Sequence, residues 1–240
     1  MAGDRITDLY LGTSGEIFSP RARTEAIERI DWMVAQATGE SVLDAGCSQG
    51  IATVLMAREG KRVVGLEPDA EALEYAQRLL SAEPAETRER VTFVGTTLED
   101  LATQGERYDA VVCGEVLEHL DDASGFLEAT WGLLRSGGVL VLTTPFAVTS
   151  HKDHKSIFFL TNFHALVSRC FVTQELFVRH KKIHFVGTRQ AGPLASAAPP
   201  CDATALRRLL ELTEQAVVDL ERQYYLPRIT DLRRQRRRDR

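Results

Sequence analysis

The sequence is poor in cysteine and aromatic residues and has no long apolar run. Its four cysteines among 240 residues are scattered, without a Cys-x-x-Cys pair, which excludes a disulfide-dense mini-protein and predicts reduced thiols in the cytoplasm. Apolar stretches such as 137–142 are far shorter than the ~20 residues that cross a bilayer, so we expect no membrane span. Acidic side chains near the start argue against a secretory signal.

Charge is unevenly distributed along the chain. The net charge is −5, but residues 228–240 contain seven Arg and two Asp, a net of +5, so the rest carries about −10. An acidic body argues against a broad nucleic-acid groove, because phosphate binding needs a basic surface. The basic tail has the composition of a solvated end, although it offers the positive charge that a nucleic acid would need.

Short apolar runs alternate with amphipathic segments through the first 145 residues. The runs that predict buried strands are 41–44, 62–66, 91–94, 108–113 and 139–143. Helical periodicity between them, at 51–58, 70–80 and 123–134, implies right-handed crossovers. Further on, 174–179 and 183–188 are close enough to form a hairpin. The predicted fold is α/β: a doubly wound, mostly parallel seven-stranded sheet that ends in an antiparallel hairpin.

Two helices and a linker complete the predicted organisation. Residues 22–37 and 203–225 are amphipathic, and a helix with Thr161 as its N-cap is expected over 161–169. Residues 191–202 are rich in Ala and Pro and are interpreted as a linker. We therefore expect one domain over 1–190, with an N-terminal helical segment over about 1–40, followed by the linker and by a C-terminal helix and basic tail over 203–240. The apolar stripe of the last helix suggests a homodimer through the terminal helices.

A glycine-rich turn follows the first predicted strand. Asp44-Ala45-Gly46-Cys47-Ser48-Gln49-Gly50 lets backbone N–H groups approach a ligand closely. Glu67 ends the second strand, where an acid can accept hydrogen bonds from both hydroxyls of a ribose. Together they indicate a nucleoside-containing cofactor, although the spacing differs from the G-x-G-x-x-G of dinucleotide folds.

A second motif follows the fourth predicted strand. If residues 115–119 turn into a helix, Glu115, Glu118 and His119 lie on one face. Two carboxylates and an imidazole suit a divalent cation such as Mg²⁺. The segment 151–154 follows the fifth strand at the same sheet edge, and we expect His151 and His154 to divide the roles of fourth ligand and general base between them.

These motifs resemble the class I S-adenosylmethionine-dependent methyltransferases over about residues 41–188. The resemblance implies that the glycine turn (Asp44, Gly46, Ser48 and Gly50) holds the methionine part of the cofactor, and that Glu67 holds its ribose. Ser48 replaces the usual middle glycine, and Thr96 stands where the family often has an acid. Adenine is therefore expected to meet Pro68 and the backbone of Thr97 and Leu98, with Cys113 and Glu115 completing the set of cofactor-binding residues.

The resemblance extends to three kinds of methyltransferase. The ubiquinone-pathway O-methyltransferases share the E-x-x-E-H pattern, and the bacterial small-RNA 2′-O-methyltransferases share it together with the H-x-D-H of residues 151–154. The segment 15–32 looks more like enzymes that methylate sugars. We expect a cation-assisted O-methyltransferase with metal ligands Glu115, Glu118, His119 and His151, and with His119, His151 and His154 as catalytic residues. The acceptor is a sugar, saccharide or related small-metabolite hydroxyl; RNA, or a non-catalytic binding role, is the alternative.

Overall fold

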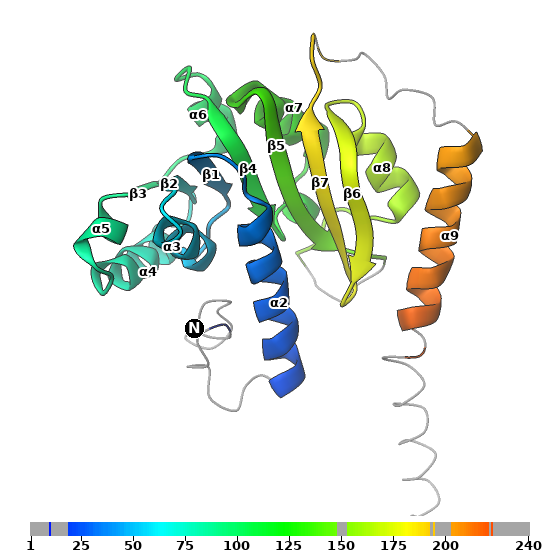
Figure 1. The fold of residues 1–240 in the computed structure, drawn as a ribbon, viewed down its shortest axis with the longest axis horizontal. Coiled ribbons are helices and arrows are strands. Elements are labelled where there is room, and N and C mark those ends of the chain that lie inside the picture. The colour runs from blue at the N-terminus through cyan, green and yellow to red at the C-terminus, as the bar shows by residue number, and fades with distance from the viewer. Residues whose placement is uncertain are drawn as a thin grey trace, which may run out of the picture.

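A single seven-stranded sheet organises the chain (Figure 1). The computed structural model describes residue 10, residues 19–147, 153–192 and 194, residues 203–220, and residue 222. Its strands, in chain order, are β1 (Ser41–Ala45), β2 (Arg62–Leu66), β3 (Val91–Val94), β4 (Tyr108–Gly114), β5 (Leu134–Pro145), β6 (Phe171–Arg179) and β7 (Lys182–Arg189). The spatial order is β3-β2-β1-β4-β5-β7-β6, with β7 antiparallel to both β5 and β6. The predicted parallel sheet with its terminal hairpin is therefore confirmed.

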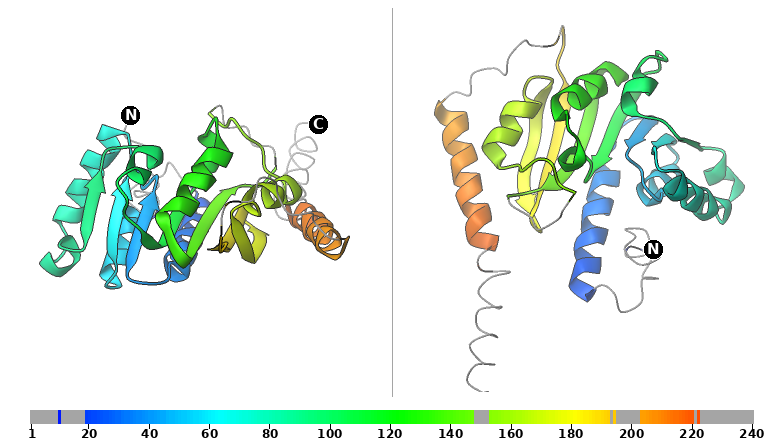
Figure 2. Two further views of the ribbon diagram at one scale, coloured as in Figure 1. Left: turned by 90° about the horizontal axis from the view of Figure 1, so that it is seen from above. Right: turned by 180° about the vertical axis from the view of Figure 1, so that it is seen from behind.

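Helices cover both faces of this sheet (Figure 2). They are α2 (Pro20–Gln36), α3 (Ile51–Arg58), α4 (Ala70–Ser81), α5 (Ala85–Arg88), α6 (Leu98–Ala102), the 3-10 turn η2 (Leu117–His119), α7 (Ala123–Leu133), α8 (Leu160–Val167) and α9 (Ala203–Leu220). One apolar cluster joins α2 and α3 to the sheet, and a larger one joins it to α7 and α8. Since β4 and β5 are buried on both faces, their sequences are apolar almost throughout. None of the described helices combines the length and apolar character of a bilayer span.

Two local expectations are corrected by the structure, and two short helices are additional to the predicted elements. The predicted gap between the helix over 123–134 and the strand over 139–143 is absent, because β5 begins at Leu134 directly after α7, and a register shift opposite Tyr108 and Ala110 accommodates Gly137 and Gly138. Thr161 is not an N-cap: α8 begins one residue earlier, and the Asn162 side chain accepts the Phe159 N–H at 2.7 Å. The short helices α5 and α6 were not predicted, since four or five residues carry too little periodicity.

The described cysteines are buried free thiols, namely Cys47, Cys113 and Cys170. Cys201, most of the expected linker and the arginine-rich tail lie outside the described residues.

Candidate active site

The glycine turn after β1 folds back against the end of β2. Gly46 and Gly50 have positive φ values of 77° and 79°, and Ser48 shares this left-handed backbone with a φ of 48°. The N–H groups of Gly46 and Cys47 both donate to the Leu66 carbonyl, at 2.8 and 2.9 Å. The turn is therefore fixed by backbone bonds, and its three left-handed residues keep it tight.

Glu67 links the end of β2 to this turn. Its Oε2 accepts the Ser48 N–H and its Oε1 accepts the Asp69 N–H, both at 3.0 Å. Each carboxylate oxygen can accept a second hydrogen bond. A half-buried anion thus stands at the rim of the turn, with acceptor capacity for a ligand bearing hydroxyl groups.

Asp44 lies beneath the turn rather than at its surface. Its side chain is buried and accepts the Thr53 hydroxyl at 2.6 Å. Burial raises the pKa of Asp44 to about 6; the Thr53 hydrogen bonds oppose the rise, and the nearby Glu67 charge adds to it. At neutral pH the buried Asp44 carboxyl beneath the turn is therefore ionised, and its ionisation lowers the free energy of unfolding.

This burial predicts a pH-dependent effect of Asp44→Asn. The folded-state pKa of about 6 exceeds the ordinary value of 3.8, so the folded protein binds more protons between pH 4 and 6 and loses stability as the pH rises through that interval. The variant removes this loss, and its free energy of unfolding is expected to exceed that of wild type by about 1–3 kcal/mol at pH 8 but not at pH 4. Urea unfolding of both proteins without ligand measures the difference; a pH-independent difference contradicts it.

The other residues expected at the cofactor differ in exposure. Pro68 is exposed beside Glu67, whereas the Leu98 and Cys113 side chains are buried in the core. Thr97 is the N-cap of α6, and its hydroxyl accepts the Asp100 N–H at 3.3 Å. The side chains of Leu98 and Cys113 are therefore not available to a ligand.

The E-x-x-E-H segment is not a continuous helix. Glu115 has a φ of 60° and still donates its N–H to the Thr143 carbonyl at 2.8 Å, as if β4 continued. Only Leu117–His119 then form a 3-10 turn. The helix expected over 115–119 is therefore wrong, because Glu115 lies outside the 3-10 turn and is not part of the group that Glu118 and His119 form with His154.

Glu115 lies between two cations that the sequence reasoning missed. Lys182, the first residue of β7, forms an ion pair with Glu115 Oε2, and Arg29 of α2 lies close by. Burial opposes ionisation, but Lys182 and Arg29 outweigh it and lower the pKa of the Glu115 carboxyl. The second oxygen, Oε1, is buried without a hydrogen-bond partner among the described residues. Arg29 also donates to the Thr143 hydroxyl at 3.3 Å, which brings α2 to this edge of the sheet.

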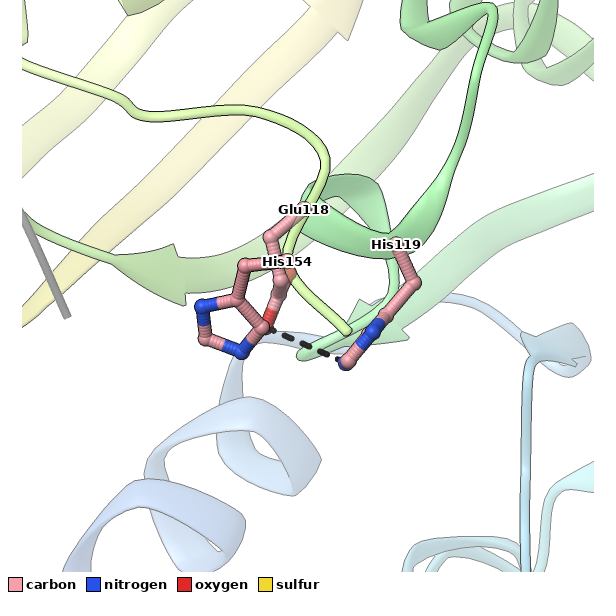
Figure 3. Close-up of side chains that lie close together, drawn as sticks. All are labelled: Glu118, His119 and His154. Carbon is pink, nitrogen blue, oxygen red and sulfur yellow. Dashed lines mark ion pairs between the residues drawn. The ribbon is translucent and has the colours of Figure 1, made fainter. Parts of the chain in front are cut away.

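Glu118 and two imidazoles form a compact cluster (Figure 3). The ligand atoms of Glu118, His119 and His154 all lie within 4.8 Å of one another. Glu118 Oε1 is 4.0 Å from His119 Nε2, and the rings of His119 and His154 meet edge to face with centroids 4.9 Å apart. The turn η2 supplies two of these residues, and the loop before α8 supplies the third.

Hydrogen bonds orient the cluster from behind. Thr144 donates its hydroxyl to Glu118 Oε2 at 3.0 Å, which leaves Oε1 toward His119. His119 Nδ1 lies 3.1 Å from the Asp153 carbonyl; donating a proton there leaves Nε2 as the unprotonated nitrogen that faces Glu118. The N–H of Lys155 donates to the Glu118 carbonyl at 2.8 Å and fastens the histidine-bearing loop to the turn.

The electrostatics of this cluster favour a positive charge. Burial, together with the neighbouring Glu115 charge, raises the pKa of Glu118 to about 7. A carboxylate with two imidazole nitrogens is the type of donor set that borderline divalent metals prefer. Of the expected ligands, Glu118 and His119 are brought together, Glu115 is paired with Lys182, and His151 lies outside the described residues.

The glycine turn and the cluster belong to one site. A Cβ placed on Gly46 would lie 2.4 Å from the Val116 side chain, so the turn packs directly against the E-x-x-E-H segment. Both follow strands that are neighbours in the sheet, β1 and β4. Ligands of doubly wound sheets bind at this carboxyl edge.

The remaining described histidines lie apart from the cluster. His184 is buried beside Trp32 and stacked on Phe177 with ring centroids 4.8 Å apart, and burial lowers its pKa to about 4. His180 pairs with Glu28 of α2 at 2.8 Å. Burial also lowers the pKa of His164. His184 and His180 thus contact side chains of α2 and β6 and take no part in the cluster of Glu118, His119 and His154.

Residues 43–142 match the methyltransferase domain family. The chain is 35% identical over 120 residues to a ubiquinone biosynthesis O-methyltransferase of Vibrio vulnificus, covering 48% of this chain and 49% of the relative. It is also 35% identical over 145 residues to the enzyme of that name from Erwinia tasmaniensis, covering 59% and 57%. The chain thus spans about half the length of the curated relatives that it matches.

Solved methyltransferases share the fold. The N-methyltransferase NodS from Bradyrhizobium japonicum, in complex with S-adenosyl-L-homocysteine, superposes with a TM-score of 0.59 at 16% identity, covering 76% of this chain and 98% of that one. The glycopeptide N-methyltransferase MtfA, complexed with S-adenosyl-L-methionine, has a TM-score of 0.56 at 17% identity, covering 68% and 93%. Residues 43–142 thus match the methyltransferase domain family, and the seven-stranded sheet has the fold of solved methyltransferases.

Proposed function

We propose that the protein transfers the methyl group of S-adenosylmethionine to a hydroxyl of a small molecule, with the help of a bound divalent cation. The observation that carries this proposal is the meeting of Glu118, His119 and His154 at the sheet edge where the glycine turn lies. An O-methyltransferase must deprotonate a weakly acidic hydroxyl while holding it in line with the donor. A cation site beside the donor site meets both needs.

The residues around the glycine turn fit the proposed donor. A Cβ at Gly46 would collide with Val116, so glycine at this position keeps the turn packed against the segment that carries Glu118 and His119. Glu67 has acceptor capacity for ribose hydroxyls, and exposed Pro68 follows it directly. When bound, S-adenosylmethionine supplies an electrophilic methyl group.

The cluster fits a divalent cation of borderline character. Glu118 Oε1, His119 Nε2 and an imidazole nitrogen of His154 would hold it, and it would lower the pKa of a bound hydroxyl. Because two of the three donors are imidazoles, Mn²⁺, Fe²⁺ or Zn²⁺ suits this set better than the Mg²⁺ that the sequence suggested. Glu115 could become a further metal ligand only if its ion pair with Lys182 were broken.

The protein's own groups then divide the work. Thr144 and the Asp153 carbonyl orient Glu118 and His119, so that the ligand atoms of these two side chains converge. With His154 in the cluster, His151, three residues earlier in the chain, becomes the proposed proton acceptor. Arg29 brings α2 toward the same edge, where this helix would exclude water from the reaction.

The loop that carries His154 also offers an apolar surface to the acceptor. Ile157 and Phe159 are large apolar side chains that remain 49% and 39% exposed, and the Phe159 ring contacts Phe146 edge to face. An acceptor with two adjacent oxygens and one apolar face fits such a surface. Saccharide rings and catechol-type rings both have this character. The relatives named ubiquinone biosynthesis O-methyltransferase support a hydroxyl group on a ring as the methyl acceptor.

Transfer of a labelled methyl group tests this proposal. The full chain is incubated with labelled S-adenosylmethionine and Mn²⁺, and with a saccharide, a catechol or single-stranded RNA in turn. The expected result is O-methylation of a saccharide or catechol that is lost with a chelator and restored by the metal. Methylation of RNA alone, or transfer that is unchanged in chelator, overturns the proposed acceptor or the proposed cation, respectively. Tight cofactor binding without turnover on any acceptor supports the non-catalytic alternative.

A further inference from the structure

The C-terminal helix α9 has a broad apolar surface of which the domain covers only one side. Leu209 and Ala216 are buried as α9 packs against α8 and β6. Leu206, Leu210 and Val217 remain 43%, 54% and 49% exposed. Figures 1 and 2 show α9 at the outer end of the molecule, beyond α8. Three exposed apolar side chains along one face of a peripheral helix indicate a surface for a partner.

The three exposed apolar residues, together with the half-buried Thr213 and Leu220, follow the spacing of a coiled coil. Steps of four and three residues connect the following positions: Leu206, Leu210, Thr213, Val217 and Leu220. In heptad terms these are d and a positions. Arg207 and Glu214 then occupy the e positions and are exposed, whereas the buried Leu209 and Ala216 occupy the g positions. We call the line of a and d positions the seam. The g positions on one side of the seam are covered by the protein's own domain, and the e positions on the other side carry one positive and one negative charge.

We propose that α9 pairs in antiparallel orientation with α9 of a second copy of this chain, about a two-fold axis. In that arrangement a positions face d positions, so Leu206 meets Val217 of the second copy and Leu210 meets its Thr213. The e positions of the two helices then lie side by side, and Arg207 meets Glu214 of the second copy twice by symmetry. A parallel pair would instead bring e against g, and both g residues are already buried in their own domain.

The size of this seam sets the expected affinity. Eighteen residues of helix span about 27 Å, and two such helices bury on the order of 1,000 Å², near the lower limit of specific interfaces. A dimer with a dissociation constant in the micromolar range is expected.

Sedimentation velocity of the full chain at about 1–200 μM tests the pairing. Arg207→Glu and Glu214→Arg each place like charges together and are expected to weaken dimerisation at least about tenfold. Mixing these two variants brings opposite charges together at both symmetry-related contacts and is expected to restore association as a heterodimer. The protein that carries both substitutions is expected to dimerise like wild type.

Two further variants separate the seam from the rest of α9. Leu210→Ser is expected to give a monomer, and Arg208→Glu, a matched charge reversal at an f position, is expected to leave the dimer intact; circular dichroism checks that each variant is folded. A monomeric wild type, a dimer that survives Leu210→Ser, or charge variants that fail to associate when mixed would each overturn the proposal.

Discussion

Glu118→Gln is expected to reduce methyl transfer by about two to three orders of magnitude, the usual effect of removing one charged group from a preorganised site. The amide keeps the size of the side chain, and its oxygen can still accept the Thr144 hydroxyl. What is lost is the negative charge that faces His119 and would balance a divalent cation. Folding is not expected to suffer, because burial raises the pKa of the native carboxyl to about 7 and disfavours its charged form.

Two measurements distinguish this loss from a general defect. Calorimetric titration with Mn²⁺ is expected to show binding by wild type and none by the variant, whereas the affinity for S-adenosylhomocysteine stays within about threefold. Glu89→Gln, at an exposed carboxylate after α5, provides the matched control and should leave both unchanged. A fully active Glu118→Gln protein, or one that binds Mn²⁺ as wild type does, would show that the cluster is not a cation site.

The sheet could be predicted because its signals are local. Strands buried on both faces need continuous apolar runs, and β4 and β5 have them. The glycine turn was equally visible, since its positive φ values at Gly46 and Gly50 are conformations that favour glycine. Chain order then placed Glu67 and the E-x-x-E-H segment at one edge of the sheet, because parallel strands end on the same side.

What the sequence did not reveal depends on contacts between distant residues. Glu115 and Lys182 are 67 positions apart and meet only because the first residue of β7 lies opposite the end of β5, at Pro145. The left-handed backbone of Glu115 is also a tertiary effect, fixed by its hydrogen bond to Thr143. The choice of His154 for the cluster depends on how Lys155 anchors the loop to Glu118, which spacing alone does not encode.

Glu67→Ala is expected to weaken binding of S-adenosylhomocysteine by about 1–3 kcal/mol, or roughly 5- to 150-fold, because ligand hydroxyls lose a charged acceptor. Calorimetry measures the dissociation constant. Glu40→Ala, an exposed carboxylate just before β1 at the opposite edge of the sheet, provides the control and should bind as wild type does. Unchanged affinity in Glu67→Ala would remove this residue from the proposed cofactor site.

Weaker binding of S-adenosylhomocysteine by Glu67→Ala has two explanations. Glu67 could contact the ribose, or it could act through the glycine turn, because it also accepts the Ser48 N–H. A cofactor analogue that lacks one ribose hydroxyl separates them through a double-mutant cycle. If Glu67 contacts the ribose, deleting the hydroxyl costs wild type more affinity than it costs Glu67→Ala, and the coupling energy is about 1 kcal/mol or more. If Glu67 only supports the turn, the analogue loses the same affinity in both proteins, and the ribose must be held by another part of the sheet edge.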